Sequence, residues 1–99
     1  MHSRILKQMK DAVRFRQYIV SLHAVEEMDD DGVSIFDIEH CILSGEVAER
    51  QKDQKSAEWK YLVQGVTLQE RGICVVTKFS CTGKMVVITI YALNKGERI

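Results

Sequence analysis

The sequence predicts an α+β domain, because segments with helical spacing come first and segments typical of β-strands come last. Turn residues separate three runs rich in β-branched and aromatic residues, which are the predicted strands over residues 58–66, 72–79 and 84–91. A chain of 99 residues is the size of one domain, so residues 1–99 are expected to fold as a single unit. We expect two to three N-terminal helices packed on one face of a curved antiparallel sheet of three to four strands.

The N-terminal segment has the spacing of an amphipathic helix, with Lys and Arg between its apolar residues. Those apolar residues are Ile5, Leu6, Met9, Ala12 and Val13. Residues 15–20 are ambiguous, and a short extended link is one interpretation. Ser21 is a suitable N-cap for a second helix from His23 to about Asp30, with Val25 and Met28 on its buried side.

A third helix follows after a short break. Gly32 stands where a helix C-cap favours a residue that tolerates positive φ. Ser34 and Asp37 resemble a capping box with Asp in the Glu position, and the helix that they open is expected to end at Ser44-Gly45. Residues 47–48 begin an extended segment. Residues 50–57 have almost no apolar content and are expected to form a polar loop.

Turn lengths decide which strand residues share a face. Thr82-Gly83 predicts a two-residue hairpin turn, since Gly supplies positive φ. The expected opposite pairs are then Lys78 with Val87 and Val76 with Thr89. Because side chains alternate along a strand, this register places Lys78, Thr89 and Tyr91 on one face.

The first hairpin is the less certain of the two turns. A four-residue loop over 68–71 sets Tyr61 opposite Lys78 and brings Trp59 to the same face, whereas a three- or five-residue loop brings Lys60 there instead. The opposite face is expected to cover the core, with Leu62, Ile73, Val75, Phe79, Val86, Ile88 and Ile90.

Positive and negative residues are equal in number but are unevenly distributed along the chain. The net charge is zero, yet nine acidic residues and no Lys or Arg lie between His23 and Glu49, while the segment before Leu22 is basic. Such segregation can steer a polyanion to one face and a cationic partner to another, or it can be neutralised internally.

Several classes of protein do not fit this composition. The three cysteines form no CxxC pair, so structural disulfides and a cysteine zinc site are not expected. The sequence also lacks His, Asp and Glu residues at the spacing of metal ligands, and it lacks a phosphate-binding loop. We therefore expect no metal and no nucleotide cofactor. Apolar runs are far too short to cross a membrane and no signal peptide precedes the domain, which favours a cytoplasmic protein.

An aromatic and cationic sheet face is typical of several RNA-contacting proteins, where rings stack on bases and Lys or Arg contacts phosphate. The alternative is that Trp59 and Tyr91 are ordinary half-buried strand residues and that Lys78 only adds solubility. His23 lies at the start of its helix, where the dipole disfavours the protonated imidazole. A neutral imidazole there could act as a general acid or base, or it could only tie the helix start to neighbouring backbone.

A set of short motifs along the chain resembles a known family. The motifs are Ser21-Leu22-His23-Ala24, Glu27-Met28, Asp31-Gly32-Val33, Asp37-Ile38, Gly45-Glu46-Val47, Glu49-Arg50-Gln51, Trp59-Lys60-Tyr61, Gly65, Lys78, Thr82-Gly83-Lys84 and Val87-Ile88-Thr89-Ile90-Tyr91. They extend over nearly the whole chain, and the S-x-H-A start and the I-T-x-Y finish are fairly specific. The chain resembles the small bacterial family called domain of unknown function 4258.

That family is similar to the RelE/ParE-type toxins, in which N-terminal helices pack on a curved antiparallel sheet. Relatives of this RelE-like fold include messenger-RNA endonucleases that an antitoxin encoded alongside neutralises. The resemblance implies that His23, Lys78 and Tyr91, together with Arg50, Lys60 and Tyr61, are family positions. Many members carry Arg where this chain has Glu27, which argues against a mechanism that needs a cation there.

These patterns lead to one hypothesis, a toxin-like RNA-binding domain that acts as a metal-independent endoribonuclease (mRNA interferase) of a toxin–antitoxin system. A base would activate the ribose 2′-hydroxyl, a cation would stabilise the charge at phosphorus, and an acid would protonate the leaving 5′-oxygen. The candidate catalytic residues are His23, Lys78 and Tyr91. The candidate RNA-binding residues are Arg50, Trp59, Lys60, Tyr61 and Thr89.

The alternative is a non-catalytic protein-interaction module that binds its partner through a strand edge or through the acidic helices. Expected partners are therefore RNA or the ribosome under the first hypothesis, with a cognate antitoxin. A protein partner or a second copy of the chain is expected under the alternative.

Overall fold

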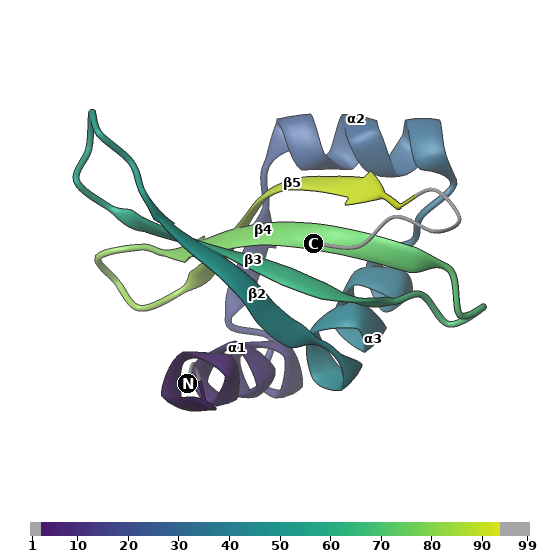
Figure 1. Cartoon of the computed structure of the whole chain (residues 1–99), viewed down its shortest axis with the longest axis horizontal. Helices are drawn as coiled ribbons and strands as arrows, with labels where there is room; N and C mark the ends of the chain where they lie inside the picture. Colours follow the sequence, from purple (N-terminus) through teal and green to yellow (C-terminus); the bar gives the residue numbers. More distant parts are fainter. Residues whose placement is uncertain (1–2, 94–99) are drawn as a thin grey trace.

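The computed structural model describes residues 3–93, which form three helices and one five-stranded sheet (Figure 1). In chain order the elements are α1 (Ser3–Arg14), β1 (Tyr18–Val20), α2 (Leu22–Asp31), α3 (Ile35–Ser44), β2 (Glu46–Lys52), β3 (Trp59–Val66), β4 (Gly72–Phe79) and β5 (Met85–Ala92). The strand order is β1-β5-β4-β3-β2, with β1 parallel to β5 and the other neighbours antiparallel. The predicted α+β class is confirmed, but the sheet is mixed.

The sheet has five strands, one more than the predicted maximum of four. The ambiguous segment before Ser21 contains β1, whose residues pair with 85–87 of β5. The prediction of a polar loop over residues 50–57 is wrong for residues 50–52, because β2 continues through Lys52 and pairs with β3. An edge strand exposed to water needs few apolar residues, so its composition resembles that of a loop.

Local capping rules explain the ends of α2 and α3. Ser21 Oγ accepts a hydrogen bond from Ala24 N at 3.1 Å, and Gly32 ends α2 with φ of 66°. At the start of α3, Ser34 and Asp37 form the predicted capping box, with Ser34 N donating to the Asp37 carboxylate at 2.9 Å. The buried-side prediction for α2 is half right, because Met28 packs on the core and Val25 is exposed.

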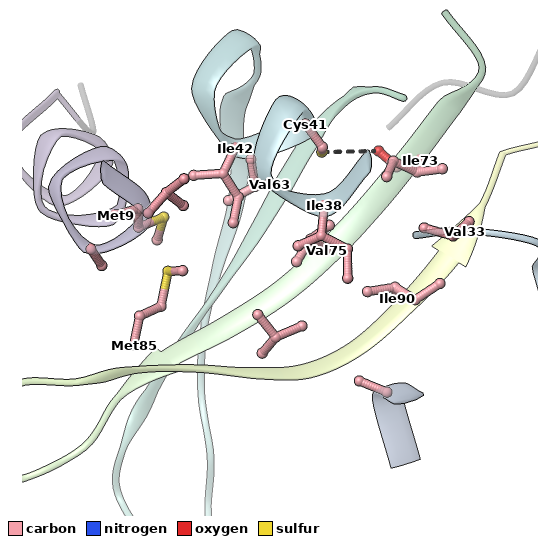
Figure 2. Close-up of a cluster of buried hydrophobic side chains, with 14 residues drawn as sticks. Met9, Val33, Ile38, Cys41, Ile42, Val63, Ile73, Val75, Met85 and Ile90 are labelled. Atoms are coloured by element: carbon pink, nitrogen blue, oxygen red, sulfur yellow. Dashed lines mark hydrogen bonds between the residues drawn. The ribbon is translucent and has the colours of Figure 1, made fainter. Parts of the chain in front are cut away.

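The core lies between the helices and one face of the sheet (Figure 2). α3 packs against β3 and β4 and beside α1, while α2 lies along β5 (Figure 1). Figure 2 shows Met9 of α1 and Met85 of β5 pointing toward one another, and the Cys41 thiol donates to the Ile73 carbonyl at 3.8 Å. Thr77 is a buried polar residue, and its hydroxyl donates to Met9 Sδ at 3.9 Å.

The hairpin between β4 and β5 departs from the predicted register. Ser80 N donates to Lys84 O at 2.8 Å, so three residues (81–83) form the loop, with Gly83 at φ of 87°. Lys78 consequently lies opposite Val86, and the predicted pairing with Val87 is wrong. The Thr82-Gly83 turn signal was correct in kind, but the loop is one residue longer than predicted.

A β-bulge in β5 corrects this shift farther along the strand. Thr77 pairs with Val87 and Val76 pairs with Thr89, so Ile88 is an extra residue without a partner on β4. The predicted pair of Val76 with Thr89 is therefore confirmed. As predicted, Lys78, Thr89 and Tyr91 share one face, although through a bulge and not through a regular ladder.

The first hairpin follows the three-residue alternative. Tyr61 pairs with Thr77 and Val66 pairs with Gly72, and Thr67 N donates to Arg71 O at 2.8 Å, which leaves residues 68–70 as the loop. By alternation, Lys60 shares the face of Lys78, and the prediction that Tyr61 and Trp59 lie there is wrong. The same shift corrects the core prediction, since Val63, Met85 and Val87 are buried in it. Leu62, Val86 and Ile88 were predicted there and are not core residues.

Candidate functional site

Two lysines from neighbouring strands lie together on the sheet face opposite the core. They line a depression of about 380 Å³, called here the lysine depression. Its lining residues are Ser21, Asp53, Ser56, Glu58, Lys60, Lys78, Val86 and Ile88. β3 and β4 position the two ammonium groups, and the turn over residues 53–58 forms the rim.

Each lysine of the depression has a carboxylate partner in that turn. Lys78 Nζ lies 3.3 Å from Glu58 Oε1, and Lys60 Nζ lies 3.1 Å from Asp53 Oδ2. The backbone N–H of Lys55 donates to Asp53 at 2.9 Å, and this bond first, with Lys60 second, lowers the pKa of the Asp53 carboxyl from its ordinary value. Both cations are thus close to neutralised, and their side chains are about one third exposed.

A second polar group on this side links α2 to β5. Glu27 Oε1 accepts hydrogen bonds from the Thr89 hydroxyl and from Ile90 N, the latter at 3.0 Å. His23 Nε2 lies 3.4 Å from the same oxygen, with its side chain 67% exposed. A helical spacing of four residues brings His23 and Glu27 together. Tyr91 is partly exposed near the end of β5.

Trp59 and Tyr61 lie on the other side of the sheet, next to α1. They line a cavity of about 590 Å³, called here the aromatic groove. Its lining residues are Ile5, Gln8, Asp11, Ala12, Phe15, Gln17, Ala57, Glu58, Trp59, Tyr61, Phe79 and Gly83. The guanidinium carbon of Arg50 lies 4.2 Å from the centroid of the Trp59 ring, and Lys52 Nζ lies 5.9 Å from it.

The lysine depression and the aromatic groove adjoin at one turn. Glu58 lines both. Its immediate neighbours Ala57 and Trp59 line the aromatic groove, whereas Ser56 and Lys60 line the lysine depression. The eight predicted site residues therefore separate into three groups. Lys60 and Lys78 share the depression, His23 and Thr89 meet at Glu27, and Arg50 with Trp59 and Tyr61 belongs to the groove side. Tyr91 shares the face of Thr89.

Sequence reasoning missed the carboxylates Asp53 and Glu58, as well as Phe15 and Phe79 of the aromatic groove. Phe15 could have been found by continuing the α1 spacing, since it follows Gln8 and Asp11 on one helical stripe. Phe79 was assigned to the core, and it does pack against it while also lining the groove.

Within residues 3–93, no three His, Cys, Asp or Glu side chains are grouped so that they could hold a metal ion. None of the helices in that range has the length and apolar content needed to cross a membrane.

The fold and these surfaces define a small α+β domain with a depression lined by two ion-paired lysines on one side of its sheet and an aromatic groove on the other. The family model for the domain of unknown function 4258 (DUF4258) matches residues 20–92, and the chain belongs to that family. The predicted family resemblance is thus confirmed. No curated protein and no solved structure gives a significant match to the chain.

Proposed function

We propose that this chain is a toxin-like RNA-binding domain of RelE-like ancestry that cleaves RNA without a metal ion. The observation that carries the proposal is the pair of lysines in the lysine depression, where Lys60 and Lys78 reach one concave surface from neighbouring strands. Two ammonium groups beside one another suit a phosphate of the RNA backbone, whose oxygens accept several hydrogen bonds.

The carboxylate partners of these lysines are compatible with phosphate binding. Exposed ion pairs contribute little to stability, because water screens them and the side chains lose freedom. Glu58 is about two fifths exposed, so its carboxylate can turn away when a phosphate takes its place at Lys78. The pairs would then hold the ammonium groups in position before RNA arrives.

The proton-transfer roles fall to His23 and Tyr91. His23 is exposed and lies beside the Glu27 carboxylate, which favours the imidazole orientation that points Nε2 toward it. One of the two residues would take the 2′-hydroxyl proton, and the other would give a proton to the leaving 5′-oxygen. Lys78 would stabilise the charge that develops at phosphorus. The products would carry a 2′,3′-cyclic phosphate and a 5′-hydroxyl.

Binding is tested by RNA affinity at rising salt. The logarithm of the affinity should fall linearly with the logarithm of the salt concentration. Lys60→Ala and Lys78→Ala should each make this fall less steep, by about 0.7 in the slope for a single strand. Lys84→Ala is the matched control, since Lys84 is an exposed lysine that follows the neighbouring hairpin loop and does not line the depression. Equal slopes in all three variants would exclude the depression as the phosphate site.

Cleavage is tested with RNA in the presence of a chelator, with and without ribosomes. His23→Ala and Tyr91→Phe should slow cleavage with little change in RNA affinity, and an RNA with 2′-deoxyribose at the cleaved position should resist. If the wild-type protein leaves RNA intact under both conditions and binds none, the proposal is wrong.

A protein partner is the second candidate, and one observation favours it. Around β1 and α2 three apolar side chains are exposed, Ile19 at 52%, Leu22 at 74% and Val25 at 39%. α2 carries five acidic residues and no Lys or Arg. A basic amphipathic partner such as an antitoxin segment would suit this surface. Leu22→Ser should then abolish its binding without changing RNA affinity.

A further inference from the structure

We propose that the aromatic groove is a pocket for one unpaired nucleobase, with the attached phosphate held outside it by Arg50 and Lys52. The inference that the base belongs to an RNA strand rests on the proposed function. The pocket itself can be tested with free nucleotides. Its volume of about 590 Å³ lies in the range of small-ligand sites.

The walls of the groove are the surfaces on which a flat ring stacks. Phe15 comes from the end of α1, Trp59 and Tyr61 come from β3, and Phe79 comes from the end of β4. Phe15 is 70% exposed and Trp59 is 41% exposed, so both rings present apolar area to whatever enters. Aromatic side chains stack on bases of any sequence because every base has a π face.

The polar atoms of the groove fit the edge of a base better than an anion. Gln8 and Gln17 offer amide donors and acceptors, and Asp11 and Glu58 offer carboxylate acceptors. Amides and carboxylates are the side chains that pair with the amino and ring nitrogens of bases. Asp11 is paired with Arg14 and Glu58 with Lys78, and no Lys or Arg is among the residues that line the groove. The lining therefore offers no cation to a phosphate, and the charged part of a nucleotide is placed outside.

Two cations stand where that phosphate would lie. Arg50 and Lys52 project from β2 and approach the Trp59 ring, at 4.2 and 5.9 Å from its centroid. Arg4 also lies on the α1 stripe that includes Gln8, by its spacing of four residues. A base stacked on Trp59 would bring its 5′-phosphate toward these groups.

The position of the aromatic groove relative to the lysine depression fits a single strand of RNA. Glu58 lines both, so one nucleotide could occupy the groove while a neighbouring phosphate reaches Lys78 across the turn over residues 53–58. The α1 wall of the groove, which Gln8, Asp11 and Phe15 form, lies outside the range of the family match. Base binding at this wall is therefore inferred from this chain's own residues.

Trp59 is the one tryptophan of the sequence, so its fluorescence reports directly on the groove. The folded full chain is titrated separately with AMP, GMP, CMP and UMP, and with ribose 5-phosphate as the probe that lacks a base. We expect saturable quenching by at least one nucleotide and none by ribose 5-phosphate. Non-saturable quenching that is equal for all probes would overturn the inference.

Two phenylalanine variants locate the binding. Phe15→Ala should weaken the nucleotide affinity by about tenfold, the size expected for losing one stacking ring. Phe36→Ala is the matched control, because Phe36 is 60% exposed on α3 and does not line the groove. Circular dichroism checks that both variants fold. If Phe15→Ala leaves the affinity unchanged, the base does not bind in the groove.

The Lys60→Ala/Lys78→Ala variant separates the two proposals. It should lower RNA affinity and leave mononucleotide quenching unchanged, because neither lysine lines the groove. RNA binding without nucleotide quenching would overturn the base pocket and leave the proposed function standing. Nucleotide quenching without RNA binding or cleavage would support the pocket and overturn the proposed function.

Discussion

One oxygen of Glu27 accepts hydrogen bonds from both Thr89 and Ile90, and so joins α2 to β5 across 62 residues of sequence. β1 pairs only with residues 85–87 of β5, so it does not extend far enough to accept a hydrogen bond from the N–H of Ile90. The Glu27 carboxylate, with its side chain 26% exposed, takes the place of a strand neighbour at this edge.

We predict that Glu27→Ala lowers the free energy of unfolding by about 1.5–3 kcal/mol, the range for losing hydrogen bonds to a charged group. Glu26→Ala is the matched control, because Glu26 is the exposed neighbour on the same helix, and its effect should stay within about 0.5 kcal/mol. Urea unfolding measures both. Equal losses in the two variants would mean that the edge contact contributes nothing.

The pKa of Tyr18 gives a prediction at high pH. Burial first, and the hydrogen bond to Glu39 second, raise this pKa from 10.0 to about 12. The neutral phenol is therefore favoured in the folded state, and its contribution to stability is full below pH 10 and is lost as the pH rises toward 12. In an ultraviolet titration of the folded protein, one tyrosine should ionise late, and Tyr18→Phe should remove that step. A wild-type titration in which every tyrosine ionises near pH 10 would contradict this.

The three cysteines should differ in reactivity. Cys81 is exposed in the hairpin loop, whereas Cys41 and Cys74 are buried, and burial raises the pKa of the Cys41 thiol to about 12. A thiol reagent at neutral pH should modify one cysteine rapidly in the folded protein and three in denaturant. Cys81→Ser should abolish the rapid reaction. Rapid modification that persists in this variant would show that a buried thiol is accessible.

Gly65 is a position where a methyl group has no room. A Cβ there would lie 2.6 Å from the Cys41 carbonyl oxygen and 3.0 Å from its sulfur. Gly65→Ala should therefore force α3 and β3 apart and destabilise the fold by about 1–3 kcal/mol. Gly72→Ala is the control, since its nearest contacts would be at 3.5 Å to Leu93. Thermal unfolding compares the two, and similar midpoints would refute the prediction.

What the sequence predicted well depended on rules that act within a few residues. The caps at Ser21 and Gly32 and the capping box of Ser34 with Asp37 are all present, because each requires only one turn of chain. The range of β4 was also predicted residue for residue, since its apolar run is bounded by turn residues on both sides.

What failed depended on partners distant in sequence. β1 has three residues and forms only because β5 offers a parallel neighbour, which no local pattern reveals. The first hairpin loop is one residue shorter than the predicted four, and the second is one residue longer than the predicted two. One residue of register moves a whole strand to its other face. Lys60 and Tyr61 exchanged places for this reason, and the aromatic groove followed from the exchange.

The extra residue at Ile88 gives the hairpin tip and the strand beyond it two different registers against β4. Loss of one residue from the 81–83 loop, taken up by straightening the strand at Ile88, would leave Thr89 and Tyr91 in place but would turn the buried Met85 and Val87 away from the core. The bulge therefore couples the length of the hairpin tip to the packing of β5 against α1.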